Sequence, residues 1–428
     1  MSKGLKRFAL GLVAVGLCLV LLLTGAVPVC EAGPDGKVVK IGLHGILTGA
    51  IATVGVPMTY GAIDSARYVS ERGGIDGVKI GMKWEDTRAA VPRSITAHRR
   101  FKEAGVVAEI YFVVGVSDVM SPTQQEDEIP ALQTSGHFTL AGGPTKPIPW
   151  VFNQGPGMPV ECASVLQFIQ REWVEERPCR VGAIVYDETV ARDFLEGFKY
   201  ADKFGVEYIG HEIVPLLGTL DTSTEWLRSA GKEPDWMLVW VSGATLTTLV
   251  RDAARLEIQK KGIKLACCYG FDIPELRISG EACEGWYIWR GNFGPTCWQV
   301  ERFPGLKAML EAGARWRSYD VNMLPSNYIA TWNFATIVYE GIRLAIEKVG
   351  YENLTGRAVR DGMASIKDFS GWDSGSMAPV TMSDDKPYYG SAQQIHQVQQ
   401  GKIVPVSGDI EWVELPDPIL KQTWARYF

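Results

Sequence analysis

Apolar runs of strand length alternate with amphipathic helical segments from residue 37 onward. The pattern predicts strands at residues 37–45, 78–86 and 106–115, with helices at 58–74 and 92–105 between them. A pair of glycines ends the first helix, and a proline stands at the first position of the second. Because the third strand is apolar on both faces, we expect helices to cover both sides of the sheet. This order of strands and helices predicts a parallel α/β sheet.

The same alternation restarts after a segment rich in Gly and Pro at residues 153–159. Further strands are predicted at 180–188, 206–214, 236–243 and 264–270. The longest predicted helix follows at 327–350, and the polar tail from Pro379 suggests a final hairpin. The chain therefore predicts two α/β lobes built on one plan.

The first 32 residues have the pattern of a secretory signal peptide. A basic start is followed by an apolar run and then by small residues, with cleavage expected near Ala32. We therefore expect the mature protein in the periplasm. Two alternatives remain open. One is an uncleaved membrane anchor, because the run approaches the length of a spanning helix. The other is a lipid anchor on Cys18 or Cys30, although a bulky residue precedes each of these cysteines.

Composition and charge narrow the classes of partner. The chain has 428 residues, 46% of them hydrophobic. This length exceeds the roughly 100–200 residues of a typical single domain and agrees with two lobes. The net charge is −6 and the basic residues are scattered. A nucleic-acid partner would require a basic patch, so we expect small or neutral partners and no nucleic acid.

Six cysteines follow the signal segment: Cys162, Cys179, Cys267, Cys268, Cys283 and Cys297. An exported chain could oxidise them, and Cys283 with Cys297 is the first pair to test. Buried free thiols are an equal alternative. Because the sequence has no CxxC pair and no histidine at zinc spacing, we predict no metal site.

Motifs for phosphate, dinucleotide or hydrolytic chemistry are missing from the sequence. It contains no GxSxG, GxxxxGK[ST], GxGxxG or HExxH pattern, and its five histidines are far apart. We therefore expect no cofactor and no enzymatic activity. An exported α/β hydrolase is the alternative from another class, with Ser242 as its candidate nucleophile.

A stretch of small residues at 47–55 follows the first predicted strand. In parallel sheets, ligands lie beyond the carboxyl ends of the strands, and small residues there let the backbone approach a ligand. The stretch could therefore form one wall of a ligand cleft, and a tight turn at its glycines is the alternative. Trp84, Trp240 and Trp289 fall at other predicted strand ends and are further candidates for the cleft.

Residues 38–80 resemble the start of periplasmic leucine/isoleucine/valine-binding proteins, with a strand, a small-residue turn, a helix and a GGIxG exit. Similar likenesses in VVAEIYFVVGVSDVMSPTQQ, RVGAIVYDETVARDFLEGF and CCYGFD extend the resemblance over nearly the whole mature chain. That family consists of solute-binding subunits of ABC importers. The resemblance implies a type I periplasmic binding protein, in which two doubly wound parallel-sheet lobes are joined by a three-stranded hinge and close around an amino acid.

The resemblance also implies how the chain is divided. Residues 33–154 and 290–377 would form the N-terminal lobe, and residues 155–289 and 378–428 the C-terminal lobe, after the signal peptide at 1–32. It further implies a monomer that closes by a hinge and docks on permease subunits in the membrane. A ligand-sensing subunit on the same fold is an alternative function, because transport and sensing would share the cleft.

The family's ligand-binding positions map onto both lobes. Hydroxyls and backbone N–H groups for the ligand α-carboxylate correspond to Ser117, Asp118, Val119, Ser135, Phe138 and Thr139. The group for the ligand ammonium corresponds to Asp272, for which a helix cap is the alternative role. Wall positions correspond to Val54, Ala191, Gly243 and Tyr328, with Thr189 close by.

Departures from the family pattern bear on the ligand. Val54, Ala191 and Gly243 stand where relatives have aromatic side chains, which enlarges or reshapes the pocket. Asp118 brings a carboxylate close to where an anion would bind. We therefore expect a branched-chain or other hydrophobic amino acid, or a related amide or aromatic acid, without choosing among them.

Overall fold

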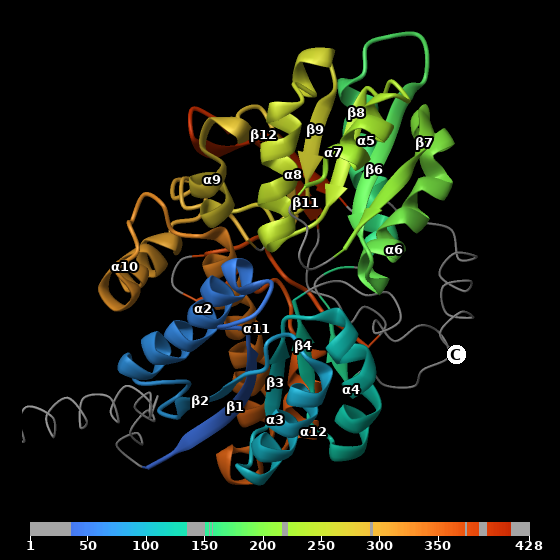
Figure 1. Ribbon diagram of the computed structural model, residues 1–428. Coiled ribbons are helices and arrows are strands. Elements are labelled where there is room, and N and C mark those ends of the chain that lie inside the picture. The colour runs from blue at the N-terminus through green and yellow to red at the C-terminus, as the bar shows by residue number, and fades with distance from the viewer. Residues whose placement is uncertain are drawn as a thin grey trace, which may run out of the picture.

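The chain forms two α/β lobes in the computed structural model (Figure 1). The structure describes residues 36–134, 150–153, 155, 157–215, 221–291, 294–372, 375–384 and 392–411. The predicted signal peptide, including Cys18 and Cys30, lies outside these residues. Within the described part, no helix combines the length and apolar character needed to cross a membrane.

A five-stranded sheet forms the base of the first lobe, in the order β2-β1-β3-β4-β5. All of its strand pairs are parallel, and the central strand β1 pairs with both β2 and β3. The strands are β1 (Val38–Gly45), β2 (Lys79–Asp86), β3 (Ala108–Tyr111), β4 (Ala131–Gln133) and β5 (Val151–Phe152).

A seven-stranded sheet forms the base of the second lobe, in the order β12-β11-β10-β9-β8-β6-β7. Strands β6 to β10 run parallel, whereas β11 and β12 form the predicted final hairpin and add antiparallel pairs at one edge. The strands are β6 (Cys179–Tyr186), β7 (Val206–Val214), β8 (Trp236–Trp240), β9 (Lys264–Cys267), β10 (Tyr287–Gly291), β11 (Ala392–Gln399) and β12 (Lys402–Glu411).

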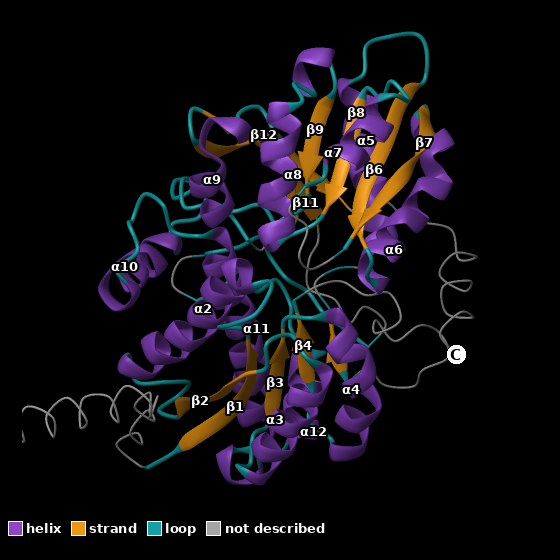
Figure 2. Ribbon diagram, in the orientation of Figure 1, coloured by secondary structure: helices purple, strands orange, loops and turns teal. Residues whose placement is uncertain are grey.

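Helices flank both sheets (Figure 2). Those around the first sheet are α2 (Ala52–Glu71), α3 (Val91–Glu103), α4 (Val114–Asp127), α11 (Ser326–Val349) and α12 (Gly356–Met363), while α10 (Leu306–Arg317) packs against α2 and α11. Those around the second sheet are α5 (Met158–Glu172), α6 (Thr189–Glu196), α7 (Ser223–Ala230), α8 (Gly243–Arg255) and α9 (Ile273–Ser279). Short 3₁₀ segments are η2 (Gly197–Phe204), η3 (Gln259–Lys261), η4 (Gly280–Cys283) and η5 (Tyr351–Asn353).

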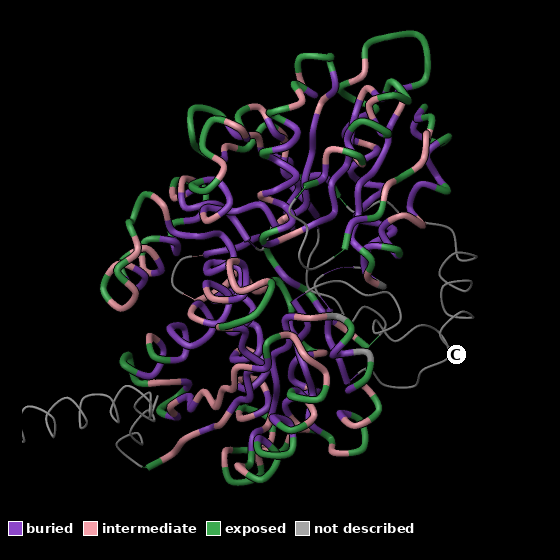
Figure 3. The backbone as a smooth tube through the Cα atoms, in the orientation of Figure 1, coloured by how far each residue is buried: buried purple, intermediate pink, exposed green. Residues whose placement is uncertain are grey.

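Each lobe has its own hydrophobic core, seen as the buried interior in Figure 3. In the first lobe, Ile41 and Leu43 of β1 share a core with Phe334 and Tyr339 of α11. In the second lobe, apolar residues of β6, β8 and β9 pack with α5 and α8. Sequence-distant helices complete the first core because burying apolar surface, rather than chain order, determines which elements pack together.

The chain passes between the lobes three times, between β5 and α5, between β10 and α10, and between α12 and β11. Blue to teal and then orange segments of Figure 1 make up the first lobe, and green to yellow and then red segments make up the second. The predicted fold class, two parallel-sheet lobes with three connections, is confirmed. The exact residues at which each lobe begins and ends stay a prediction.

Helix α2 begins at Ala52, earlier than the predicted start near residue 58. Gly55 lies in its first turns, where an ideal Cβ would stand 2.5 Å from the Cβ of Ile46. The small residues of this stretch therefore let the helix approach the end of β1. The sequence pattern missed this start because a helix N-terminus made of Gly, Thr and Ala shows little apolar periodicity.

Strand β3 is shorter than the apolar run 106–115 predicted, because α4 already begins at Val114. Val113, just before the helix, has extended backbone angles of φ −128° and ψ 123°. Periodicity alone does not separate a short buried strand from a buried helix start. As a result, residues 117–119 lie within α4 and not in the loop where the sequence placed them.

All six described cysteines are free and buried. The Sγ of Cys283 donates to the carbonyl of Gly280 at 2.9 Å, and that of Cys297 to the carbonyl of Asn322 at 3.5 Å. Burial raises the pKa of each of these two thiols to about 12. The suggested Cys283–Cys297 disulfide is therefore wrong for this structure, and the alternative of buried thiols holds.

Candidate functional site

A cleft of about 580 Å³ is lined by residues of both lobes. Its lining residues follow the carboxyl ends of β2, β3 and β6: Ala89, Val91, Val113, Gly115, Val116, Asp187, Glu188, Val190 and Arg192. Ligand pockets in proteins have volumes of about 300–1,000 Å³ and prefer the carboxyl ends of parallel strands. This cleft is therefore the candidate site.

Two helices begin at the cleft, α4 from the first lobe and α6 from the second. Their N-cap residues, Val113 and Glu188, have extended backbone angles and make no side-chain cap hydrogen bond. The first N–H groups of a helix have no partner inside the helix and carry the positive end of its dipole. Both helix starts therefore offer donors to a polar or anionic part of a ligand.

Glu188 is the half-buried acid of the cleft. Burial raises the pKa of its carboxyl group above the ordinary value. The neighbouring Asp187 forms an ion pair with Arg192. A carboxylate whose charge is disfavoured by burial is stabilised when a cation approaches, so Glu188 is the cleft group best placed to meet a ligand ammonium. The sequence pattern did not single out Glu188, although an acid at the end of a predicted strand was the available signal.

Aromatic side chains gather at the carboxyl ends of the second sheet. The ring of Trp240 makes edge contacts with Tyr186 at 5.4 Å and with Tyr269 at 6.1 Å between ring centroids. Trp289 lies instead within β10, where its Nε1 donates to Glu161 at 2.6 Å. Of the predicted tryptophans, Trp84 packs against the first core, so only Trp240 belongs to this aromatic group.

Asp272 follows β9 and is fully buried. Its Oδ1 accepts the backbone N–H of Ser326 at 3.0 Å, and its Oδ2 accepts that of Asn327 at 2.7 Å. Nη2 of Arg290 lies 3.5 Å from Oδ1. The structure thus places the carboxylate as a cap on α11, the alternative role noted from the sequence. Contact between Asp272 and a ligand ammonium stays a prediction.

The other predicted positions are spread over both lobes. Val54 and Ala191 are buried in α2 and α6, whereas Val119 on α4 is 52% exposed. Ser117 is buried in α4, where its hydroxyl donates to the side chain of Gln133. Tyr328 of α11 is buried away from the cleft lining, and its hydroxyl donates to Asp64 at 3.0 Å.

Gly243, the first residue of α8, marks a contact between the lobes. Its φ of +67° lies in the left-handed region, and an ideal Cβ would stand 3.0 Å from the carbonyl oxygen of Ala50 in the first lobe. Asp118 and Thr189 lie on α4 and α6. Ser135, Phe138 and Thr139 lie outside the described residues. The structure therefore brings the starts of α4 and α6 to one cleft, but does not gather all predicted positions there.

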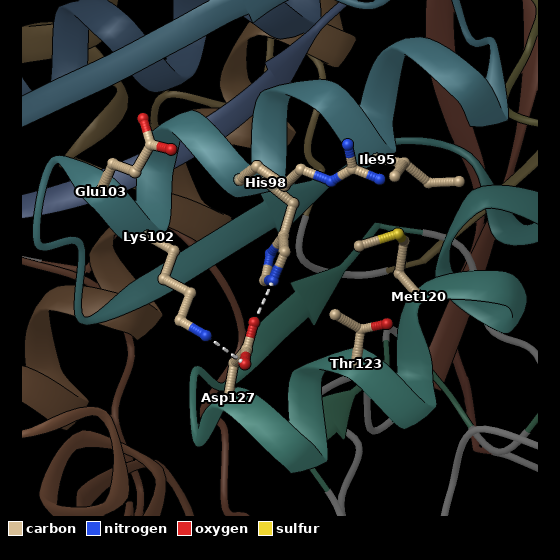
Figure 4. A pocket seen from close by; sticks show the side chains of 8 residues that line it. Ile95, His98, Lys102, Glu103, Met120, Thr123 and Asp127 are labelled. Atoms are coloured by element: carbon tan, nitrogen blue, oxygen red, sulfur yellow. Dashed lines mark hydrogen bonds and ion pairs between the residues drawn. The ribbon is translucent and has the colours of Figure 1, made fainter.

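A groove of about 620 Å³ lies between α3 and α4 of the first lobe alone (Figure 4). Three of its ionisable groups bond one another: His98 lies 2.9 Å and Lys102 lies 2.5 Å from the carboxylate of Asp127. A groove from a single lobe, with these charges already paired, offers less to a ligand than the interlobe cleft does.

The model of the periplasmic binding protein family matches residues 38–407. A search of curated protein sequences found no match.

Solved structures share the fold at low sequence identity. A branched-chain amino acid ABC transporter protein from Thermus thermophilus with bound valine has a TM-score of 0.76 and 20% identity, over 88% of this chain and 97% of that one. An ABC transporter substrate-binding protein from Aeropyrum pernix has a TM-score of 0.75 and 19% identity, over 91% and 98%. A fatty acid ABC transporter substrate-binding protein from Thermomonospora curvata has a TM-score of 0.74 and 18% identity, over 89% and 96%.

Proposed function

The chain belongs to the periplasmic binding protein family, and from that premise we propose that it captures a small amphiphilic solute between its lobes and delivers it to the permease subunits of an ABC importer. The resemblance to leucine/isoleucine/valine-binding proteins is confirmed at the level of family and fold. In this proposal, the protein works in the periplasm, closes around the solute by its hinge and carries out no chemistry on it.

The observation that carries this proposal is the cleft lined by both lobes. Its walls combine apolar side chains, including Val91, Val116 and Val190, with polar groups and with helix starts that suit a carboxylate. Glu188 suits an ammonium. We therefore propose a hydrophobic amino acid, or a related amide or aromatic acid, as the solute. Valine and fatty acids, named for two structural relatives, are amphiphiles of this kind.

Binding without turnover is favoured by the surroundings of Ser242. Its hydroxyl bonds Tyr186. The four described histidines each bond other groups: His44 and His98 bond Glu109, His211 bonds Tyr208, and His396 bonds Gln299. Each described histidine is thus paired with a group other than Ser242, which disfavours a histidine as its general base.

A thermal-shift screen of the purified mature protein tests the function. A solute at about 100 times its dissociation constant should add about 2.7 kcal/mol to the free energy of unfolding. We expect stabilisation by at least one class among hydrophobic amino acids, their amides and aromatic acids, and no conversion of the solute. Release of product from a bound ester or amide, abolished by Ser242→Ala, would support the hydrolase instead.

Glu188→Gln tests the acid of the cleft. For a solute that carries an ammonium group, we expect binding to weaken by about 1.5–3 kcal/mol, the range for hydrogen bonds to charged groups, measured by calorimetry. Glu176→Gln, which removes the same charge from an exposed position of the same lobe, is the matched control. If Asp272→Asn weakens binding and Glu188→Gln does not, the ammonium lies at Asp272.

A further inference from the structure

Helix α2 of the first lobe packs against α8 and α9 of the second lobe (Figure 1). Thr53 stands near the start of α2, and Glu275 stands in the first turn of α9. Glu275 is fully buried, so its carboxyl group is out of contact with water. A titratable side chain therefore lies in the contact between the lobes, outside the cleft proposed for the solute.

One oxygen of the Glu275 carboxyl group is used within the second lobe, and the other is not. Oε2 accepts the backbone N–H of Asp272 at 3.2 Å. Oε1 of Glu275 and Oγ1 of Thr53 are both buried without a well-formed hydrogen bond among the described residues. The two groups are neighbours, since the Thr53 hydroxyl lies close enough to influence the ionisation of Glu275. These two side chains therefore face each other across the boundary between the lobes.

The surroundings of Glu275 disfavour a negative charge. Arg290 of β10 lies 3.5 Å from Asp272, so this cation is already engaged, and Glu275 forms no ion pair with any described residue. Burial raises the pKa of Glu275 to about 8, with a further contribution from the charge of Asp272, and the Thr53 hydroxyl opposes this rise only in part. A buried carboxylate without a cation is costly, so this arrangement holds Glu275 as a neutral acid at neutral pH.

The titratable groups of the elements around α9 do not neutralise Glu275. The thiols of Cys267 in β9 and Cys283 in η4 have raised pKa values because they are buried, so both stay uncharged. The buried acids Asp64 of α2 and Asp252 of α8 are each engaged by other residues. The exposed charges of these elements lie in water: Arg67 and Glu71 of α2, Arg251 and Arg255 of α8, Arg277 of α9 and Glu281 of η4.

We propose that Glu275 and Thr53 form a proton-dependent latch between the lobes, in which closure holds Glu275 as a neutral acid. The inference rests on the proposed function, because closure around the solute is the step that buries the latch. In the open arrangement water reaches Glu275, which then ionises as an ordinary acid. Closure at neutral pH therefore takes up one proton from water, and the protein binds its solute more tightly in acidic surroundings.

The direction of the pH effect follows from the two ionisation states of Glu275. Its pKa is raised from an ordinary 4.5 to about 8 in the buried position. The advantage of the closed state is therefore fully present below the ordinary value and is lost as pH rises through the raised value. We expect the association constant to fall about tenfold or more between pH ~6 and pH ~8, relative to a variant without this acid.

Calorimetry of the mature protein with leucine, phenylalanine, phenylacetate and phenylacetamide tests the latch. The number of protons taken up is measured from the binding enthalpy in two buffers of different ionisation enthalpy. For each probe that binds, the wild type should take up about one proton more than Glu275→Gln, which keeps the shape of the neutral acid. Titration of the probe or of other side chains is common to both proteins and cancels. Glu281→Gln, an exposed acid of the neighbouring η4, should behave as the wild type does.

A second substitution keeps the test decisive if Gln is not tolerated. Glu275→Met, an uncharged side chain of similar length, should also remove the additional proton and the additional pH dependence. If the wild type and these variants take up equal numbers of protons and share one pH dependence, the latch is refuted while the transport function stands. If none of the four probes binds between pH ~6 and pH ~8, the proposed function fails for this class of solute and the latch fails with it.

Discussion

Asp272 joins the two lobes through a single side chain. It follows a strand of the second sheet, yet its carboxylate caps α11, whose apolar face lies in the first core. The negative carboxylate interacts favourably with the positive end of the helix dipole and forms an ion pair with Arg290. One residue therefore couples the position of α11 to the end of β9.

We expect Asp272→Ala to lower the free energy of unfolding by about 3 kcal/mol, because it leaves buried N–H groups and the charge of Arg290 without a partner. Urea denaturation of the ligand-free protein measures this. Asp272→Asn keeps one acceptor oxygen and should lose less, while Asp202→Ala, an exposed acid on η2, should change little. Equal stability of Asp272→Ala and the wild type would show that Asp272 does not stabilise the start of α11.

A buried network of charges joins β1, β3, α3 and α4 at the scale of elements. Both ring nitrogens of His98 face carboxylates, with Nδ1 2.9 Å from Glu109 and Nε2 2.9 Å from Asp127. Two acceptors require both nitrogens to carry hydrogen, so His98 is a cation here. Burial alone would lower its pKa, but the hydrogen bonds and charges of Glu109 and Asp127 raise it overall. Burial would raise the pKa of Glu109, yet the hydrogen bonds and charges of His44 and His98 lower it.

This network predicts that the contribution of His98 to stability is lost at high pH and that of Glu109 at low pH. The stability from His98 is fully present below its unfolded value of 6.5 and is lost as pH rises through its raised folded pKa. The stability from Glu109 is present above its unfolded value of 4.5 and is lost as pH falls through its lowered folded pKa. Urea melts at several pH values should therefore show that the gap between wild type and His98→Gln shrinks from pH ~5.5 to pH ~9.

The difference between the two proteins is the quantity to follow, because other histidines act in the opposite direction. Burial lowers the pKa of His211 and lowers that of His396 to about 3. These two histidines contribute equally to the stability of the wild type and of His98→Gln, so their effects cancel in the difference between the two free energies of unfolding. A gap that stays constant with pH would mean that His98 is neutral in the folded protein.

Helices α2 and α11 approach closely at Gly61, where an added Cβ would overlap the carbonyl of Tyr328. Gly61→Ala should therefore destabilise the protein by about 1–3 kcal/mol through overpacking, measured as a lower midpoint in thermal unfolding. Gly115→Ala on α4 is the control, because nothing lies within 4 Å of its added Cβ, and alanine favours a helix over glycine. Similar effects of the two changes would contradict close packing of the helices.

At the scale of the whole molecule, Gly243 of the second lobe lies against Ala50 of the first. We expect Gly243→Ala to weaken solute binding about tenfold, because a methyl group there holds the lobes apart and the left-handed backbone disfavours it by about 1–2 kcal/mol. Calorimetry measures the affinity, and small-angle scattering should show a larger radius of gyration with the solute bound.

The Gly262→Ala variant separates the effect of backbone strain from the effect of the contact between the lobes. Gly262 also has a positive φ, +83°, but no atom lies within 4 Å of its added Cβ. This variant should lose stability and keep the affinity of the wild type. Equal affinities of Gly243→Ala and the wild type would show that this contact plays no part in binding.

Periodicity predicted most strands and most helices, because buried faces impose spacings of two and of 3.6 residues on the chain. It did not predict β5 or β10. The resemblance to a family then predicted the three chain connections between the lobes. The start of α2 and the short β3 were missed, since their patterns depend on tertiary packing. Glu188 and Glu275 were missed for another reason: the role of a charge depends on what surrounds it in space, and Asp272 shows the same dependence with its cap.

The antiparallel edge of the second sheet is completed late in the chain. Strand β10 pairs with β11, but the polypeptide first returns to the first lobe through α11 and α12. As the protein is made, the edge of β10 therefore stays unpaired while the remainder of the other lobe is still being synthesised. An uncovered strand edge is an aggregation hazard. Truncations that stop before residue 392 should thus precipitate, and pauses in synthesis between α11 and β11 should lower the yield of folded protein more than pauses elsewhere.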